Sequence, residues 1–291
     1  MMSLCYLNGE FMPLAEAKIS VLDRGFIFGD GVYEVVPVFG RRPFRLAAHI
    51  ARLVRSLQET SIRVSLSVPA WQALVRDLVA RHAGEDLSVY VQVTRGAAPR
   101  NHAAPQDAEP TIFAMVSPLV AATDTPAVRA ITRIDERWQR CDIKAISLLP
   151  NVLARTAAVA EGATEAVLFR DGWLTEGAAS NVFVVRGGRI HTPPHSEHIL
   201  PGITRDTLVE SLSGTPDAVL ETMVSRDEVL HADEIWLTSS TRDLIPVSHL
   251  DGQPIGAGEP GPVYARVLEG YTRFKAADLA AVRPIPSPTA A

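Results

Sequence analysis

The chain has 291 residues, of which 47% are hydrophobic and 21% charged, a composition typical of globular proteins. The length suits one large domain or two modest ones, and the formal net charge of -5 argues against the clustered basic residues of a nucleic-acid-binding surface. There is no run of eighteen apolar residues and no basic segment followed by an apolar one at the start, so neither a membrane span nor a signal peptide is expected.

The cysteine content predicts a reducing compartment. Cys5 and Cys141 lie far apart, without a CxxC motif or a histidine at metal-ligand spacing. We therefore expect no disulfide framework and no metal site, and a cytoplasmic location is the simplest interpretation.

The chain begins with a predicted hairpin and continues through a glycine-rich segment. The hairpin joins Leu4–Leu7 to Glu10–Met12 through the turn pair Asn8-Gly9. Asp23–Gly31 contains three glycines, which allow a tight turn or the close approach of a ligand. The strand Val32–Phe39 follows.

Two amphipathic helices and two strands complete the first half. The first helix has apolar residues on one face, and the second begins at Pro69, a favoured first-turn position. The strands Leu87–Thr94 and Thr111–Ser117 enclose a loop that contains Arg100 and His102.

The second half is predicted to alternate strands and helices. A strand is expected at Val128–Ile134 and a helix at Asn151–Ala160, then hairpins at Asp171-Gly172 and Gly187-Gly188. A helix beginning at Gly202, a strand at 234–237 and a last helix from about 262 to 275 follow.

Composition suggests the domain boundaries. The small and polar residues 121–127 read as a linker between a small N-terminal domain, 1–120, and a larger domain, 128–278. The proline-rich residues 279–291 are predicted to be disordered.

Lys144 is the most unusual residue of the chain. The chain has only three lysines, and Lys144 lies within the mostly apolar run 140–149, whose alternation predicts a half-buried or buried strand. A desolvated amine is the kind that forms Schiff bases. This run alone nevertheless favours a strand-edge lysine whose amine reaches solvent, so the case depends on other parts of the chain.

Four further features could together hold a phosphorylated cofactor. Gly202-Ile203-Thr204 opens a helix, where backbone N–H groups and a hydroxyl can bind phosphate. Thr238–Thr241 places four hydroxyls in a row, and Arg52 supplies a guanidinium. Glu176 is followed by small residues, which leave room for a flat ring. Each feature alone has a plain alternative: a helix cap, a turn, a solvated arginine or a surface glutamate.

In combination and in chain order, these motifs resemble the fold type IV pyridoxal-phosphate enzymes. The resemblance covers nearly the whole chain, and its motifs are Arg140–Lys144, Asn151–Ala154, Thr175–Gly177, Ser180–Phe183 and Leu200–Arg205. It implies an α+β fold with a small N-terminal α/β domain, a larger C-terminal domain with a β-barrel-like core, and the cofactor between them.

The resemblance also implies roles for individual residues. Lys144 would be the catalytic lysine, holding pyridoxal 5'-phosphate as an internal aldimine and moving the proton during transamination. Glu176 would bind the pyridine nitrogen. The phosphate and ring would be held by Arg52, Leu200, Ile203, Thr204, Ser239 and Ser240.

Within this group the N-terminal half is most similar to D-amino-acid transaminases. The relevant stretches are Asp23–Gly25, Phe28–Val35 and Val93–His102. By this resemblance Tyr33, Arg100 and His102 form a carboxylate trap, with Thr241 also on the substrate side, and Arg100 and His102 reach the neighbouring subunit of a homodimer. The expected partners are small amino acids and 2-oxo acids, such as D-alanine or D-glutamate with pyruvate or 2-oxoglutarate.

Two departures and several alternatives accompany this prediction. Ala178-Ala179 stands where serines are usual in D-amino-acid transaminases, and Arg242 either extends the substrate pocket or pairs with Asp243. The alternatives are an (R)-selective amine or branched-chain aminotransferase, a lyase similar to aminodeoxychorismate lyase, and a non-catalytic binding protein.

Overall fold

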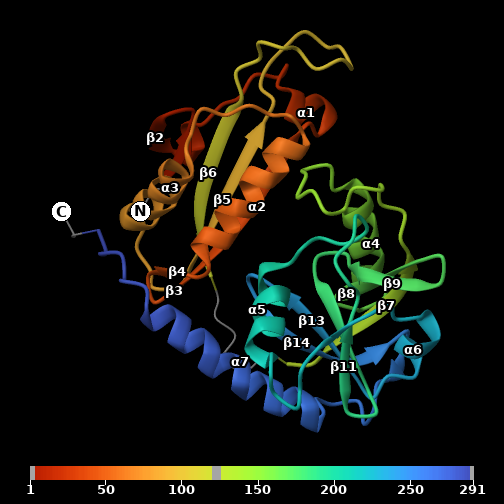
Figure 1. The fold of residues 1–291 in the computed structure, drawn as a ribbon. Coiled ribbons are helices and arrows are strands. Elements are labelled where there is room, and N and C mark those ends of the chain that lie inside the picture. The colour runs from red at the N-terminus through yellow and green to blue at the C-terminus, as the bar shows by residue number, and fades with distance from the viewer. Residues whose placement is uncertain (1–3, 120–125, 289–291) are drawn as a thin grey trace. The chain divides into compact units, whose positions relative to one another are not determined.

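The computed structural model describes residues 4–119 and 126–288 (Figure 1). The chain divides into two compact units. Unit 1 comprises residues 1–120, 143–147 and 278–291, and unit 2 comprises 121–142 and 148–277. Residues 120–125, which include most of the predicted linker, lie outside the described residues.

Unit 1 is built on a six-stranded antiparallel sheet in the order β2-β1-β6-β5-β3-β4. Its predicted hairpin is confirmed: Leu4 to Leu7 pairs with Glu10 to Pro13, and Asn8 and Gly9 both have positive φ, as a type I′ turn requires. The strands are β1 (Leu4–Leu7), β2 (Glu10–Pro13), β3 (Gly31–Phe39), β4 (Arg42–Pro43), β5 (Leu87–Thr94) and β6 (Thr111–Pro118).

The two predicted helices of this unit are confirmed as α2 (Leu46–Glu59) and α3 (Val68–Arg81). α2 packs on β3, and α3 packs on α2 and β5, so that their apolar faces form one core with the sheet. The Ser67 side chain accepts a hydrogen bond from Ala70 at the start of α3. The shorter η1 (Leu14–Glu16) and α1 (Arg24–Phe28) precede β3.

Unit 2 contains a nine-stranded mixed sheet in the order β12-β11-β10-β13-β14-β7-β8-β9, with β15 paired to β14. β9 at one end of this path also contacts β10, so the sheet curls as the barrel-like prediction requires. The strands are β7 (Val128–Ile134), β8 (Glu165–Arg170), β9 (Trp173–Gly177), β10 (Asn181–Arg186), β11 (Arg189–Thr192), β12 (Leu220–Glu221), β13 (Glu234–Ser239), β14 (Asp243–Leu250) and β15 (Gln253–Pro254).

Four helices accompany this sheet among the described residues. α4 packs on β8 and β7, α5 on β13, and α6 on β9. Their bounds are α4 (Leu149–Ala160), α5 (Ile203–Leu212), α6 (Arg226–Leu230) and α7 (Pro262–Ala280).

The prediction of a strand around Lys144 is wrong. Residues 143–147 bend at Ile143 and Ile146 and make only an isolated bridge, between Ala145 and Val32. The Tyr33 N–H donates to the Lys144 carbonyl at 2.9 Å, and the Ile146 N–H donates to Gly31 at 3.0 Å. This short backbone pairing with the start of β3 places Lys144 in unit 1, whereas the predicted boundaries put it in the larger domain.

The prediction of a disordered tail does not hold for residues 279–288. α7 continues to Ala280, and Ile285 is buried in the core of unit 1. The Arg41 guanidinium donates to the carbonyls of Ile285 and Pro286 at 2.6 and 2.8 Å. Proline-rich composition predicted disorder, but the buried Ile285 side chain and the guanidinium groups of Arg41 and Arg42 hold this segment.

Candidate active site

Lys144 lies beside the aromatic ring of Tyr33 in unit 1. Its side chain is half-buried rather than buried, and its Nζ lies 4.2 Å from the ring centroid of Tyr33. Tyr33 in turn stacks on Tyr90, with ring centroids 5.7 Å apart. The Lys144 backbone N–H donates to the Ser56 hydroxyl at 3.3 Å, and its carbonyl accepts from the Tyr33 N–H. The side-chain amine therefore extends from a backbone whose N–H and carbonyl are both hydrogen-bonded.

Arg52, predicted to bind phosphate, forms a buried ion pair that sequence reasoning missed. Its Nε and Nη2 donate to the two carboxylate oxygens of Glu34 at 2.9 and 2.6 Å. His49, one turn earlier on α2, lies 3.0 Å from Glu34 through Nδ1. Burial alone would raise the pKa of Glu34, but Arg52 and His49 overcome it and hold that pKa well below its usual range.

Arg100 and His102 gather around Phe28. The Arg100 guanidinium carbon lies 5.3 Å from the centroid of the Phe28 ring, and the His102 ring lies 5.5 Å from it. Both side chains are exposed, and neither has a carboxylate partner within the part of unit 1 that the structure describes. The third predicted member of the carboxylate trap, Tyr33, lies beside the Lys144 amine and stacks on Tyr90.

Glu176 lies at the end of β9 in unit 2, surrounded by N–H donors. Its Oε2 accepts from Asn181 Nδ2 at 3.1 Å and from the Leu200 N–H at 3.0 Å, and its Oε1 accepts from Arg137. Burial raises the pKa of Glu176 to about 7, against the opposing effect of Arg137. Because every partner donates, the geometry suits the ionised carboxylate.

Arg137 was missed from the sequence, and it connects Glu176 to a second buried acid. Its guanidinium binds Asp135 through Nε and Nη2 at 2.9 and 2.8 Å while Nη1 binds Glu176. The Thr175 hydroxyl also donates to Asp135, at 2.9 Å. The one available signal was the charged pattern Asp135-Glu136-Arg137 directly after β7, which resembles an ordinary surface turn.

The predicted phosphate-binding helix start is confirmed as a structure, at the beginning of α5. The N-cap residue Gly202 has no side-chain cap, which leaves the first N–H groups of the helix to another acceptor. Thr204 is buried in this first turn. A Cβ on Gly202 would come within 1.9 Å of Asn181 Oδ1, so this close approach, beside the residue that binds Glu176, requires glycine.

The predicted hydroxyl cluster lies at the junction of β13 and β14. Ser239, Ser240 and Thr241 are half-buried there, while the buried Thr238 hydroxyl finds no partner among the described residues. Thr238 pairs with Asn181 across the sheet, so this junction and the start of α5 both adjoin Asn181. An unsatisfied buried hydroxyl suits a site that binds a polar ligand.

Arg242 does not pair with Asp243, the interpretation that the sequence slightly favoured. Asp243 instead accepts from the Tyr271 hydroxyl at 3.0 Å and from Lys275 at 2.5 Å, and the Arg242 side chain is exposed. No contact within residues 4–119 and 126–288 gives Arg242 a role in the site.

Comparison with known proteins identifies the family. Residues 31–250 match the family model of amino-transferase class IV. D-alanine aminotransferase of Bacillus licheniformis is 41% identical over 262 residues, covering 89% of this chain and 93% of that protein. D-alanine aminotransferase of Staphylococcus aureus (strain N315) is 37% identical, covering 94% of this chain and 98% of that protein.

Solved structures show the same architecture. The T.th. branched-chain amino acid aminotransferase with pyridoxamine 5'-phosphate has a TM-score of 0.88 and 27% identity, covering 96% of this chain and 95% of that one. The branched-chain aminotransferase of Thermoproteus uzoniensis with norvaline also has a TM-score of 0.88, with 25% identity, covering 98% of this chain and all of that one.

The chain therefore belongs to the class IV aminotransferases and is a pyridoxal-phosphate-dependent enzyme. The donor groups described above fit that cofactor. An uncapped helix start and adjacent hydroxyls suit the phosphate, a half-buried lysine amine suits the aldehyde, and a buried carboxylate suits the pyridine nitrogen.

Within the described ranges, no helix combines the length and the apolar character that crossing a membrane requires.

Proposed function

We propose that the enzyme transfers the amino group of a D-amino acid, with D-alanine as the first candidate, to a 2-oxo acid. The observation that carries this proposal is the pair Arg100 and His102, two exposed donors on one aromatic ring that suit a substrate carboxylate. The 41% identity to a D-alanine aminotransferase over most of both chains supports the same substrate class.

In this proposal Lys144 is the catalytic residue. Bound pyridoxal phosphate supplies an electron sink that stabilises negative charge at the substrate α-carbon. The Lys144 amine would take the proton from the substrate α-carbon, as the general base, and would deliver it to the C4′ carbon of the cofactor, as the general acid. The Tyr33 ring beside Nζ limits the directions in which the amine can move.

Glu176 and the phosphate-side residues hold the cofactor. The Glu176 carboxylate keeps the pyridine nitrogen protonated, and Arg137 keeps Glu176 in position. The N–H groups of Ile203 and Thr204 at the start of α5, with Ser239 and Ser240, bind the phosphate. Arg52 and Leu200 complete the set, with Thr241 on the substrate side.

The proposal also includes a cytoplasmic homodimer in which Arg100 and His102 serve the partner's site. Val21 and Phe26, on either side of Arg24 in the sequence, expose large apolar side chains, the kind of surface that a second copy covers. Both cysteines are buried free thiols, which suits a reducing compartment.

The substrate proposal is tested with D- and L-alanine against 2-oxoglutarate or pyruvate, in wild type and in Arg100→Ala. We expect turnover of the D-enantiomer and a KM for it that rises at least tenfold in Arg100→Ala, because the carboxylate loses a charge-assisted partner. Arg76→Ala removes another exposed arginine of unit 1, on α3, and is the matched control, with an unchanged KM. Preference for L-amino acids would instead support a branched-chain type of aminotransferase.

The shared site is tested by subunit mixing. Lys144→Ala and Arg100→Ala each damage every site of their own homodimer. A mixed dimer has one site with both residues intact, so after subunit exchange at low D-alanine roughly a quarter of the wild-type activity returns. No recovery, or a monomer by light scattering, would contradict the shared site.

A further inference from the structure

The loop from residue 95 to 110, here called the trap loop, is closed tightly at its base. Gly96 has a φ of +92°, and a Cβ there would lie 1.8 Å from the Glu109 carbonyl oxygen. Asp23 bridges the two strands below the loop, because its carboxylate accepts from Thr94 and Thr111 at 2.9 and 2.7 Å. These contacts fix where the loop begins and ends, but they do not reach Arg100 or His102.

Arg24 binds the backbone in the middle of the trap loop. Its guanidinium is buried, with Nε donating to Asp30 at 2.7 Å. Nη1 donates to the Asn101 carbonyl at 2.5 Å, and Nη2 donates to the His102 carbonyl at 3.3 Å. A planar guanidinium can serve an acid and two carbonyls together, whereas an ammonium at the end of a flexible chain cannot match this geometry.

Phe28 extends this support to the side chains of the loop. The Arg24 guanidinium carbon lies 4.8 Å from the Phe28 ring centroid, while Arg100 and His102 lie 5.3 and 5.5 Å from the same ring. Arg24 therefore supports both the backbone of the segment and the ring on which its two donor side chains pack.

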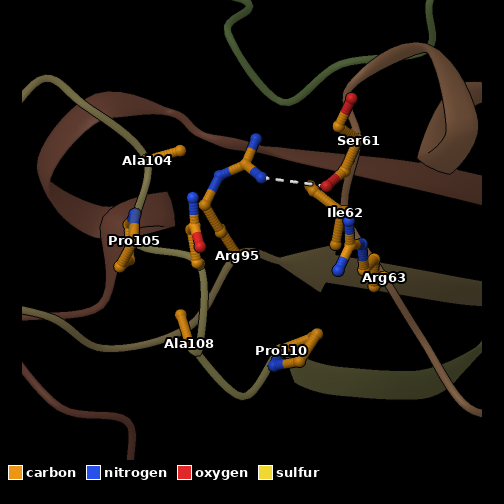
Figure 2. A pocket seen from close by; sticks show the side chains of 9 residues that line it. Ser61, Ile62, Arg63, Arg95, Ala104, Pro105, Ala108 and Pro110 are labelled. Atoms are coloured by element: carbon orange, nitrogen blue, oxygen red, sulfur yellow. Dashed lines mark hydrogen bonds between the residues drawn. The ribbon is translucent and has the colours of Figure 1, made fainter.

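The other flank of the trap loop faces a cavity of about 300 Å³ (Figure 2). Ala104, Pro105 and Ala108 line it from the loop, and Ser61 and Arg63 line it from the segment after α2. Small side chains beside a cavity provide little packing, so the segment 100–102 depends on its contacts with Arg24 and Phe28.

We propose that Arg24 is a positioning residue for substrate carboxylate recognition, acting through the carbonyls of Asn101 and His102. This inference rests on the proposed function, in which Arg100 and His102 bind the carboxylate. Arg24 touches no substrate. It sets where those two donors lie.

Arg95 provides a matched control on the same acid. It donates to Asp30 through Nε and Nη2 at 2.8 and 3.0 Å, but its other contacts are with the Thr60 and Ser61 carbonyls. Arg24→Lys and Arg95→Lys thus make the same chemical change beside Asp30. Arg95 lies at the base of the trap loop, and only Arg24→Lys removes the contacts to Asn101 and His102.

The first measurement is the saturation of the cofactor absorption change by D-alanine in each holoenzyme. We expect Arg24→Lys to raise the half-saturating concentration about tenfold with a limiting rate within threefold of wild type. Arg95→Lys should leave the half-saturating concentration within twofold. Phe28→Leu, which leaves Arg24 in place, should raise it about threefold and provides the test if Arg24→Lys does not fold.

The second measurement needs no activity: trypsin cleavage after Arg100, followed by mass spectrometry, reports how firmly the trap loop is held. Faster cleavage in Arg24→Lys than in Arg95→Lys supports the proposal. Equal cleavage or an equal change of half-saturation in the two variants would overturn it, as would faster cleavage with unchanged half-saturation. A wild type without D-amino-acid turnover refutes the proposed function instead, whatever the cleavage shows.

Discussion

The two units each bury a glutamate against an arginine, and the two pairs differ in how completely the acid is neutralised. In unit 1 both oxygens of Glu34 bind Arg52, and His49 adds a third contact. In unit 2 Arg137 gives one N–H to Glu176 and binds Asp135 through two others. The same residue types therefore produce opposite pKa shifts. The pKa of Glu34 is lowered, and the pKa of Glu176 is raised to about 7.

The difference indicates that the two glutamates have different roles. A carboxylate whose charge is already balanced, such as Glu34, orients its arginine and gains nothing from another cation. Glu176 receives a single N–H from Arg137, whose other two carboxylate contacts go to Asp135, and Asp135 also pairs with Arg170 at 3.3 Å. Burial of Glu176 with this single arginine contact raises its pKa, so a pyridinium nitrogen beside Glu176 would stabilise the charged form of the carboxylate.

The largest expected effect is a loss of stability in Glu34→Gln. The amide leaves the buried Arg52 without its acid, and breaking a buried ion pair in this way costs about 3–5 kcal/mol. Urea denaturation of the apoenzyme measures it, with Glu259→Gln, a substitution of an exposed glutamate, as the control. A loss below about 1 kcal/mol would mean that Glu34 is not a stabilising partner of Arg52.

Glu176→Gln should instead lower the rate. The amide cannot hold the pyridine nitrogen protonated, so we expect turnover to fall about 10²–10³-fold with cofactor still bound. Stability should fall less than in Glu34→Gln because Arg137 keeps Asp135. Steady-state rates, the cofactor absorption spectrum and urea denaturation together separate the two effects. Near-wild-type turnover would remove Glu176 from the ring-nitrogen role.

The pH dependence of the apoenzyme tests the raised pKa of Glu176. Between about pH 7 and its ordinary value of 4.5, the folded state binds a proton that the unfolded state does not. Stability therefore gains as pH falls through this range, by at most about 3 kcal/mol. Thermal melting of wild type and Glu176→Gln from pH 8 to 5 measures it. The gain should be absent in the variant, and it should shrink when cofactor is bound.

His49 should make the smallest contribution to the pH dependence of stability, and its sign is opposite to that of Glu176. Burial lowers the pKa of His49 below its ordinary value of 6.5, so the unfolded state protonates first and stability falls as pH drops below 6.5. His49→Gln keeps a donor for Glu34, costs about 1 kcal/mol at pH 8, and removes this acid-side loss. Equal pH slopes for wild type and His49→Gln would show that His49 does not titrate as the structure indicates.

Prediction from the sequence succeeded where the signal was local. The Asn8-Gly9 turn, the one-sided apolar pattern of α2 and the helix start at Gly202 all depend on a few neighbouring residues. It failed at residues 140–149. Apolar alternation predicted a strand there, but the structure has only a single bridge, between Ala145 and Val32. It failed also at Ile285, which composition alone placed in a disordered tail.

The site divides in the same way. Lys144, Glu176 and the Gly202-Ile203-Thr204 helix start could be proposed as site residues because the scarcity of lysine, the small neighbours and the motif order can be read along the chain. The partners of these residues were not: Arg137 binds Glu176 from 39 residues away, and Glu34 binds Arg52 from 18 away. Charged residues are common, and nothing local marks which of them will be buried together.

The sequence by itself therefore determined the turns, the helix faces, the family and the residue types available for catalysis, because each depends on near neighbours or on ordered motifs. Only the tertiary structure decided which charges meet. Arg24 lies 77 residues from Asn101, and it reaches that carbonyl because α1 and the trap loop are brought together by the packing of β3, β5 and β6. The physical reason is that a buried charge needs a partner within hydrogen-bond distance, and the fold alone sets that distance.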